Sequence, residues 1–354
     1  MAPYNKKKKP QENEGYQTFK KALSAGTIGN LYIFHGEEVY LRDYYLEQMK
    51  EKLIPDGMES FNLKEIPGKT LTMQQLSEAV DAFPMMSERT LIVVNDYDIF
   101  KAPEGDRNAL TALFEDLPEY VCLVFLYDTV PYKGDARMKK LTGAVKSHGQ
   151  VVQFTRQSQN DLIDWIRRRF KALGHDIDTA DAEYLLFLCG DLMTGLVSEI
   201  GKIGHYAQNR RVTRADIDAV AIPVIDAVVF QLTDHLARND YDRAFSVLND
   251  LLRLQQHPIM ILSVLGKHFR QLYTARVALE NKKGSRWLME LWGMRSSYPA
   301  EKLLDAARRH SLDWCKTAMR RCAETDLAMK SVSGADNTEQ LLNLILELAA
   351  GGAA

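Results

Sequence analysis

The residues best placed to do chemistry are Gly36, Glu37 and Glu38, which follow an apolar segment, Leu31–His35. A glycine turn between a buried strand and a helix is where many nucleotide-binding proteins hold phosphate, through backbone N–H groups and a lysine in the pattern G-x-x-x-x-G-K-[ST]. Here the second glycine, the lysine and the hydroxyl residue are missing, and the two carboxylates would repel phosphate. Gly68–Thr70 does not complete the pattern, because its first glycine would fall on a leucine. The sequence therefore predicts a degenerate phosphate loop without function.

Other catalytic signatures are missing too. The sequence has no G-x-S-x-G or H-E-x-x-H pattern. Asp96 has no acidic neighbour with which to form a hydrolytic Mg²⁺ site, so we predict that it forms a turn. His35 stands at a predicted strand end, where a structural role is favoured. The cysteines show neither a C-x-x-C pair nor zinc spacing, which predicts reduced, buried thiols at Cys122, Cys189, Cys315 and Cys322. We expect no catalytic residue, metal ligand or cofactor in this chain.

An apolar pair indicates a different kind of chemistry, contact with another protein. Pro84 ends a helix-like segment, and two flexible side chains, Met85 and Met86, follow it before a polar turn at 87–89. A methionine pair after a helix usually belongs to the core. The proline and the polar turn favour the opposite interpretation, because apolar residues in a connection need a partner. We therefore predict that this pair is an exposed contact.

Charge is unevenly distributed along the chain, although the net charge is only −2. Acidic residues outnumber basic ones by 18 to 8 between Asn30 and Tyr120, whereas basic residues outnumber acidic ones by 14 to 7 between Val264 and Lys330. The run Arg167, Arg168 and Arg169 adds to the basic part. Solvated helix faces explain such runs, and contact with nucleic-acid phosphates is the alternative.

The elements that must position these residues alternate between strand and helix in the first half. The strand signals are short, apolar and β-branched, as in a covered parallel sheet, and they fall at Leu31–His35, Phe61–Ile66, Thr90–Val94, Val121–Leu126 and Val151–Phe154. Helix signals separate them at Glu38–Leu53, Thr72–Ala82, Asn108–Asp116 and Ala136–Lys146. This alternation predicts an open, mainly parallel α/β sheet.

The strand signal disappears from Ser158 onward. Helices are predicted to start at Ser158 and at Thr213, and two more are predicted at Ala180–Cys189 and Met193–Tyr206. The last apolar stripe, Leu341–Leu348, suits either a core or a subunit contact. We predict a basic arm over 1–17, an α/β domain over 18–156, a small helical domain over 157–223 and a larger helical domain over 224–354.

Length and composition fit this division. With 354 residues, 46% hydrophobic and 26% charged, the chain is typical of a globular protein of two or three domains. No apolar run approaches the roughly 18 residues of a membrane span. The N-terminus carries Lys6–Lys9 without the apolar core of a secretory signal. These features predict a cytoplasmic protein with no membrane contact.

Several of these segments together resemble the delta subunit of the bacterial replicative DNA polymerase clamp loader, over about Leu31 to Leu348. Leu31–Glu38 is similar to the opening strand and non-functional phosphate loop of the family, and Phe83–Val94 to its clamp-contact region and third strand. Further similarity lies in Asp161–Ile166 with Gly174, Leu196–Ile203, Val229–Asp234 and the D-x-x-x-K motif within Glu324–Lys330.

The resemblance implies an AAA+-like α/β domain with a degenerate nucleotide site, followed by an all-α small domain and an all-α collar domain. It implies a subunit without a catalytic site of its own, belonging to the DNA polymerase III holoenzyme, a nucleotidyltransferase. The implied partners are the sliding clamp (the beta subunit), loader subunits of the tau/gamma and delta-prime types, and primer-template DNA.

The resemblance also implies roles for the residues around the methionine pair. Met85 and Met86 correspond to the clamp-binding apolar pair, where the family often has Leu and Phe. Arg89 either braces the loop or contacts the clamp. Phe83 and Pro84 would support the loop, with Phe83 as the anchor that packs the helix onto its own domain.

Two other function classes stay open from the sequence. One is an active AAA+ ATPase with a divergent phosphate loop, which a nucleotide titration would detect. The other is a stand-alone nucleic-acid-binding scaffold that uses the basic half, which steep salt-dependent DNA binding would detect.

Overall fold

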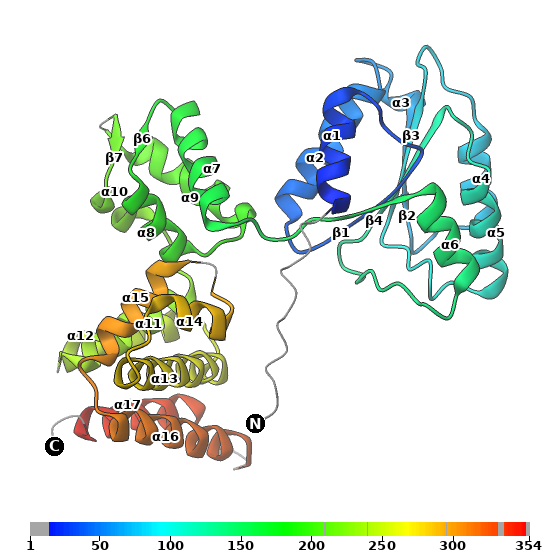
Figure 1. The fold of residues 1–354 in the computed structure, drawn as a ribbon. Helices are drawn as coiled ribbons and strands as arrows, with labels where there is room; N and C mark the ends of the chain where they lie inside the picture. Colours follow the sequence, from blue (N-terminus) through cyan, green and yellow to red (C-terminus); the bar gives the residue numbers. More distant parts are fainter. Residues whose placement is uncertain (1–13, 209, 239, 295, 332–335, 352–354) are drawn as a thin grey trace. The chain divides into compact units, whose positions relative to one another are not determined.

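The structure is a computed structural model that describes residues 14–208, 210–238, 240–294, 296–331 and 336–351. The chain divides into two compact units, Met1–Arg156 and Gln157–Ala354, which are drawn in Figure 1 and described separately here. The predicted Lys6–Lys9 arm lies outside the described residues.

The first unit is built on a five-stranded sheet in which every described pair of strands is parallel. The strands lie in the order β2-β3-β4-β1-β5. Their bounds are β1 Leu31–His35, β2 Leu63–Pro67, β3 Thr90–Asn95, β4 Val121–Leu126 and β5 Gln150–Gln153. In the register, Ile33 of β1 stands opposite Phe125 of β4 and Val151 of β5, and Val94 of β3 also stands opposite Phe125.

Helices cover both faces of this sheet because its strands are apolar on both sides (Figure 1). Ile33 and its same-face neighbours pack with α4 (Met73–Asp81), α5 (Glu104–Glu115) and α6 (Lys139–His148). On the other face, Tyr32 and Phe34 contact Phe19 of α1 (Glu14–Ala25) edge-on, at ring-centre distances of 5.4 and 5.1 Å. The remaining helices of this unit are α2 (Val39–Leu53) and α3 (Glu59–Asn62).

The second unit is mainly helical. Its first part contains α7 (Gln159–Ala172), α8 (Thr179–Cys189), α9 (Met193–Tyr206) and α10 (Arg214–Val220). Ser158 and Thr213 cap α7 and α10, each accepting a backbone hydrogen bond three residues on, as an N-cap should. The second part contains α11 (Ile225–Ala237), α12 (Tyr241–Arg253), α13 (Pro258–Glu280), α14 (Ser285–Trp292), α15 (Ser297–Ala307), α16 (Leu312–Ser331) and α17 (Asn337–Gly351).

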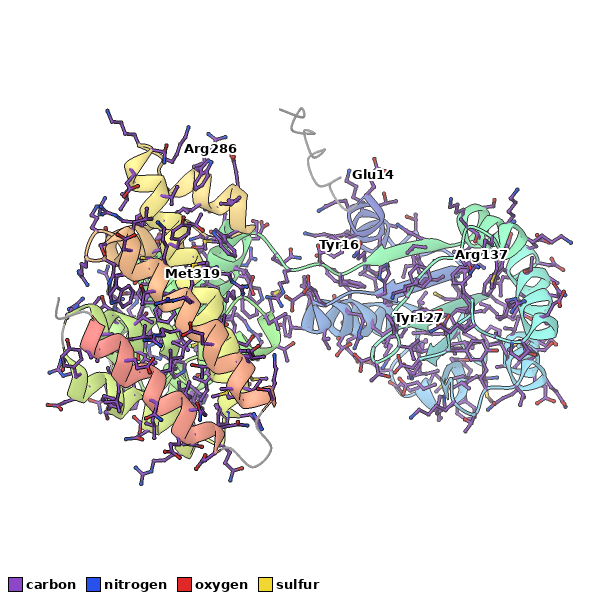
Figure 2. The ribbon with its side chains drawn as sticks, turned by 90° about the horizontal axis from the view of Figure 1, so that it is seen from below. Glu14, Tyr16, Tyr127, Arg137, Arg286 and Met319 are labelled. Atoms are coloured by element: carbon purple, nitrogen blue, oxygen red, sulfur yellow. The ribbon has the colours of Figure 1, made fainter. Side chains whose placement is uncertain are left out.

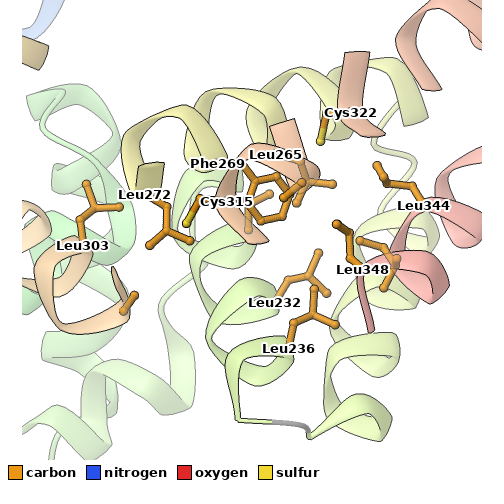
Figure 3. Packing of buried hydrophobic residues seen from close by; sticks show 14 of the residues in the cluster. Leu232, Leu236, Leu265, Phe269, Leu272, Leu303, Cys315, Cys322, Leu344 and Leu348 are labelled. Carbon is orange, nitrogen blue, oxygen red and sulfur yellow. The ribbon is translucent and has the colours of Figure 1, made fainter. Parts of the chain in front are cut away.

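The core of this second part forms around α13, which packs against α11, α14, α15, α16 and α17. Figure 3 shows Leu265, Phe269 and Leu272 of α13 among buried side chains from the surrounding helices. The predicted stripe at the end of the chain belongs to this core, because Leu341, Leu344, Ile345 and Leu348 are at most 3% exposed. A core position thus replaces the alternative of a subunit contact for these four residues.

The predicted fold class, a parallel α/β domain followed by helical regions, is confirmed, with three local corrections. The predicted strand Phe61–Ile66 begins later, at Leu63, because residues 59–62 form α3. The all-helical small domain contains two short parallel strands, β6 (Asp176–Ile177) and β7 (Arg211–Val212), too short to give a periodic signal. The arm predicted over 1–17 is too long, because α1 begins at Glu14 and Tyr16 (Figure 2) lies 9% exposed against Tyr45 and Phe154.

Among the described residues, no single helix is long and apolar enough to cross a membrane, although α8 and α9 reach that length and composition together across a 120° bend.

Candidate protein-contact site

The residues singled out in the first unit lie at opposite edges of its sheet. Since the five strands run in one direction, their C-terminal ends lie along one side of the sheet, called the carboxyl edge below. Their N-terminal ends lie along the opposite side, called the amino edge. The glycine–acid turn follows the end of β1 and lies at the carboxyl edge, where α/β sheets usually bind ligands. The segment Phe83–Arg89, called the contact loop below, precedes β3 and lies at the amino edge.

The carboxyl edge does not offer phosphate the groups that a phosphate loop supplies. The turn after β1 is only three residues long, and its Gly36 has φ +132° and leaves no room for a Cβ, which would lie 2.2 Å from the carbonyl oxygen of Phe154. The Glu38 N–H donates to that same oxygen at 3.0 Å. Glu38 is fully buried immediately before α2, and Glu37 pairs with Arg156 at 2.9 Å. A carboxylate therefore stands where a helix N-terminus would otherwise attract an anion.

Asp96 fills another part of this edge. Its carboxylate accepts hydrogen bonds from the backbone N–H groups of Asp128, Thr129 and Val130, at 2.7 to 3.1 Å, and from the Thr129 hydroxyl at 2.7 Å. Burial alone would raise the pKa of Asp96, but these hydrogen bonds outweigh it and lower the pKa. Asp96 thus orders the loop after β4. This agrees with the predicted turn role.

Two other groups at this edge also have internal partners. Arg42 of α2 is 4% exposed and pairs with Asp128 at 2.8 Å and with Asp43 at 2.9 Å. His35 contacts the ring of Tyr132, and burial lowers the pKa of this histidine, so its neutral form is favoured at pH 7. Among the described residues, no group of three or more His, Cys, Asp or Glu side chains is placed to hold a metal ion.

The contact loop, by contrast, places large apolar side chains in solvent. Met85 is 51% exposed, Met86 79% and Phe83 81%. Phe61, which precedes Asn62 on α3, is also 52% exposed. An exposed group of this kind on an ordered loop is typical of a surface that another protein covers.

Neighbouring segments hold the backbone of the contact loop. Asn62, fully buried, pairs with both backbone groups of Met85. The Ser87 hydroxyl lies 3.1 Å from the Leu53 carbonyl oxygen and accepts from the Arg89 N–H at 3.3 Å. The Arg89 guanidinium donates to the carbonyl oxygens of Ile28, Gly29 and Val121, at 2.6, 2.8 and 2.9 Å.

These contacts correct one sequence-based expectation and bear on a second that was left open. Phe83 was predicted to anchor the helix in its own domain, yet its ring lies outside the core and meets Tyr120 at a ring-centre distance of 5.1 Å. The reason is that α4 ends at Asp81, before Phe83, so Phe83 belongs to the loop rather than to the buried helix face. Arg89 was open between two roles, and its three carbonyl partners make it a brace of the amino edge. Pro84, which lies between Phe83 and Met85, is half-buried.

Asn62 could not be identified from the sequence as a support of this loop, because it lay inside a predicted strand and its partner is 23 residues away.

The basic run on α7 has partners of its own in part. Arg167 donates to the Thr179 hydroxyl at 2.5 Å, and the Arg169 guanidinium lies over the ring of Trp165, 5.4 Å from its centre. Arg168 is exposed. In the D-x-x-x-K motif, Lys330 pairs with Asp326 one helical turn earlier, at 2.8 Å. DNA contact by the three arginines stays a prediction.

Comparison with known proteins shows which family this chain belongs to. The profile of the DNA polymerase III delta subunit matches residues 32–155, and the profile of its C-terminal domain matches residues 226–347. The DNA polymerase III subunit delta of Bacillus subtilis is 22% identical over 333 residues, which cover 92% of this chain and 94% of that protein. A probable DNA polymerase III subunit delta of Aquifex aeolicus is 25% identical, over 85% of this chain and 86% of that protein.

A solved structure agrees at the level of the fold. The Bacillus subtilis DNA clamp loader delta protein matches with a TM-score of 0.55 and 21% identity, over 94% of this chain and 99% of that chain. The matched profiles, together with an AAA+-like α/β domain followed by helical regions, define the class, that of clamp-loader subunits. Within this class, the chain belongs to the delta subunit family of DNA polymerase III, which acts in DNA replication.

Proposed function

We propose that this chain binds the sliding clamp through Met85 and Met86 and helps to open the clamp for loading onto primed DNA, without hydrolysing ATP itself. The observation that carries the proposal is the exposure of both methionines on a loop whose backbone is tied to its own domain. Exposed methionines suit an irregular apolar pocket, because their side chains are long, unbranched and polarizable.

The size of the contact is sufficient for an anchor. Burying two methionine side chains contributes on the order of 3–6 kcal/mol before ordering costs are subtracted. Binding would favour an opened clamp if the pair contacts that state better than the closed one, which requires differential affinity but no chemistry in this chain.

The carboxyl edge supports the other half of the proposal. Glu38 is buried where phosphate would approach, the Glu38 N–H is already bonded to Phe154, and Asp96 occupies the N–H groups after β4. ATP would therefore act in partner subunits of the tau/gamma type, which together with a delta-prime type subunit and primer-template DNA complete the proposed assembly. These observations disfavour the alternative of an active ATPase.

The test is the double variant Met85→Ala/Met86→Ala, assayed for binding to purified sliding clamp. We expect the Kd to rise by about a hundredfold or more, because two central apolar anchors are lost. Met260→Ala, at a methionine that is 55% exposed in the second unit, is the matched control and should bind normally. A folded double variant with unchanged clamp affinity would contradict the contact assignment. Micromolar ATP affinity of the wild-type chain would contradict the ATP-independent role.

A further inference from the structure

Asn62 makes an unusual pair of bonds at the contact loop. Its side chain is fully buried at the end of α3, and both ends of its carboxamide meet the backbone of Met85. The Met85 N–H donates to Oδ1 at 2.7 Å, and Nδ2 donates to the Met85 carbonyl oxygen at 2.8 Å. The amide thus pairs with Met85 as a neighbouring strand would, while the side chain of Met85 stays half-exposed.

The same loop includes a backbone conformation that needs such support. Met86 has φ +52°, in the left-handed region that is costly for a residue with a long side chain. A conformation of this kind persists only where the surroundings fix it. The bonds from Asn62 on one side of Met86, and those of Ser87 to the Leu53 carbonyl and the Arg89 N–H on the other, provide that fixation.

We propose that Asn62 is a positioning residue for clamp binding: it holds the contact loop in its binding shape before the clamp arrives. The inference rests on the proposed function of Met85 and Met86. A loop that is already ordered does not lose conformational freedom on binding, whereas a loose loop binds only from the fraction of molecules that have the right shape. Asn62 itself is buried, so its effect on clamp binding passes through the methionines that it positions.

The first test needs no partner. Hydrogen exchange of the full chain should show slow exchange of the Met85 amide in the wild type and fast exchange across residues 83–89 in Asn62→Ala. Strand β3 should stay protected in both, which shows that the domain is folded. Gln150→Ala is the matched control, since Gln150 also donates to a backbone carbonyl, that of Gly15, but lies on β5 at the opposite side of the sheet from β2. Unchanged exchange at Met85 in Asn62→Ala would overturn the inference.

The second test measures clamp affinity. Losing both bonds to Met85 should raise the Kd by roughly tenfold in Asn62→Ala, whereas Gln150→Ala should bind like the wild type. In the Met85→Ala/Met86→Ala background the effect of Asn62→Ala should disappear, because both side chains that Asn62 positions are gone and binding no longer depends on the shape of the loop. An equal effect in both backgrounds would show that Asn62 acts independently of the methionine pair and would overturn the inference.

If Asn62→Ala does not fold, a more conservative variant, Asn62→Ser, can be tested instead. Asn62→Ser keeps a hydroxyl on the buried side but cannot pair with both groups of Met85, and the same criteria apply to it.

The two proposals fail separately. A wild-type chain that does not bind the clamp, or a Met85→Ala/Met86→Ala variant that binds normally, overturns the proposed function. A wild-type chain that binds, with a folded Asn62 variant that binds equally well, overturns only the inference about Asn62.

Discussion

The two methionines of the contact loop are exposed for different local reasons. The backbone of Met85 is paired with Asn62, so its side chain projects from a fixed point. Met86 has a left-handed backbone, a conformation that costs of order 1–2 kcal/mol for a residue with a Cβ. Strain of this kind is often found at binding sites, where the surrounding structure enforces it.

This strain predicts an inverted glycine effect at Met86. Where the backbone conformation suits alanine, a variant with glycine is less stable than one with alanine by roughly 0.4–1 kcal/mol. At Met86 we expect Met86→Gly to be at least as stable as Met86→Ala, because glycine has no Cβ to strain in the left-handed region. Urea unfolding of the two variants, followed by far-UV circular dichroism, measures the difference. The usual order, with glycine clearly less stable, would mean that Met86 is not held at positive φ in solution.

At this scale the sequence indicated the exposed residues better than their supports. Pro84 and the polar turn after Met86 were local signals for an exposed pair. Asn62 could not be identified, because its hydrogen bonds join residues that are distant in sequence and nothing in its neighbours marks them. Phe83 was misjudged because α4 ends at Asp81, so Phe83 lies outside the helix and its buried face.

At the scale of elements, Arg89 ties three parts of the amino edge together. Its guanidinium donates hydrogen bonds to Ile28 and Gly29 in the connection before β1 and to Val121 at the start of β4. Arg89 itself immediately precedes β3. Arginine suits this position, because its planar group carries five donors in a fixed arrangement. The end of the contact loop is therefore held at the N-terminal ends of three strands, β1, β3 and β4.

We predict that Arg89→Ala lowers the free energy of unfolding of the first unit by about 1–3 kcal/mol, since three carbonyl groups lose a charged donor. Arg89→Lys should recover only part of this, because one ammonium on a flexible stem cannot serve three carbonyls. Far-UV circular dichroism is the suitable probe, since all four tryptophans lie in the second unit. Arg137→Ala (Figure 2), at a 90% exposed side chain, is the control and should not change stability. Wild-type stability of Arg89→Ala would contradict the bracing role.

Most elements were predictable because their signals are local. The apolar strands of the sheet and the caps at Ser158 and Thr213 lie in the sequence itself, and α9 has the predicted bounds. The strands β6 and β7 were missed, because a pair of two-residue strands is defined by its partner rather than by its own residues. The single turn α3 before β2 was missed for another reason, because four residues are too few to show a helical period.

At the scale of the whole molecule, both units expose large apolar side chains, and the second unit also buries two histidines. His268 lies in the core with Nε2 2.8 Å from the Thr233 hydroxyl, and His310 stacks on Trp314 at a ring-centre distance of 3.8 Å. Nε2 of His310 is buried without a hydrogen-bond partner among the described residues.

Burial lowers the pKa of both histidines, from 6.5 to about 4. For His268, Asp226 opposes the shift, whereas His310 and Lys267 add to it. For His310, Arg309 adds to the shift and Asp234 opposes it. Between about pH 6.5 and pH 4 these histidines therefore bind protons in the unfolded chain but stay neutral in the folded chain. The free energy of unfolding must fall as the pH drops through this window.

The last prediction follows from this sign. Each histidine should contribute a slope of up to about 1.4 kcal/mol per pH unit to the free energy of unfolding of the second unit. His310→Phe keeps a ring against Trp314 but cannot titrate, so its slope should be flatter, and its stability at pH 7 should equal or exceed that of the wild type because a buried nitrogen without a partner is removed. Tryptophan fluorescence during urea unfolding at pH values from 4 to 7 measures both quantities. Carboxylates also titrate at the acid end of this range, but they do so in both proteins, so the difference between the two slopes reports His310 together with its electrostatic effect on His268. Identical slopes would mean that His310 is already accessible to protons in the folded chain.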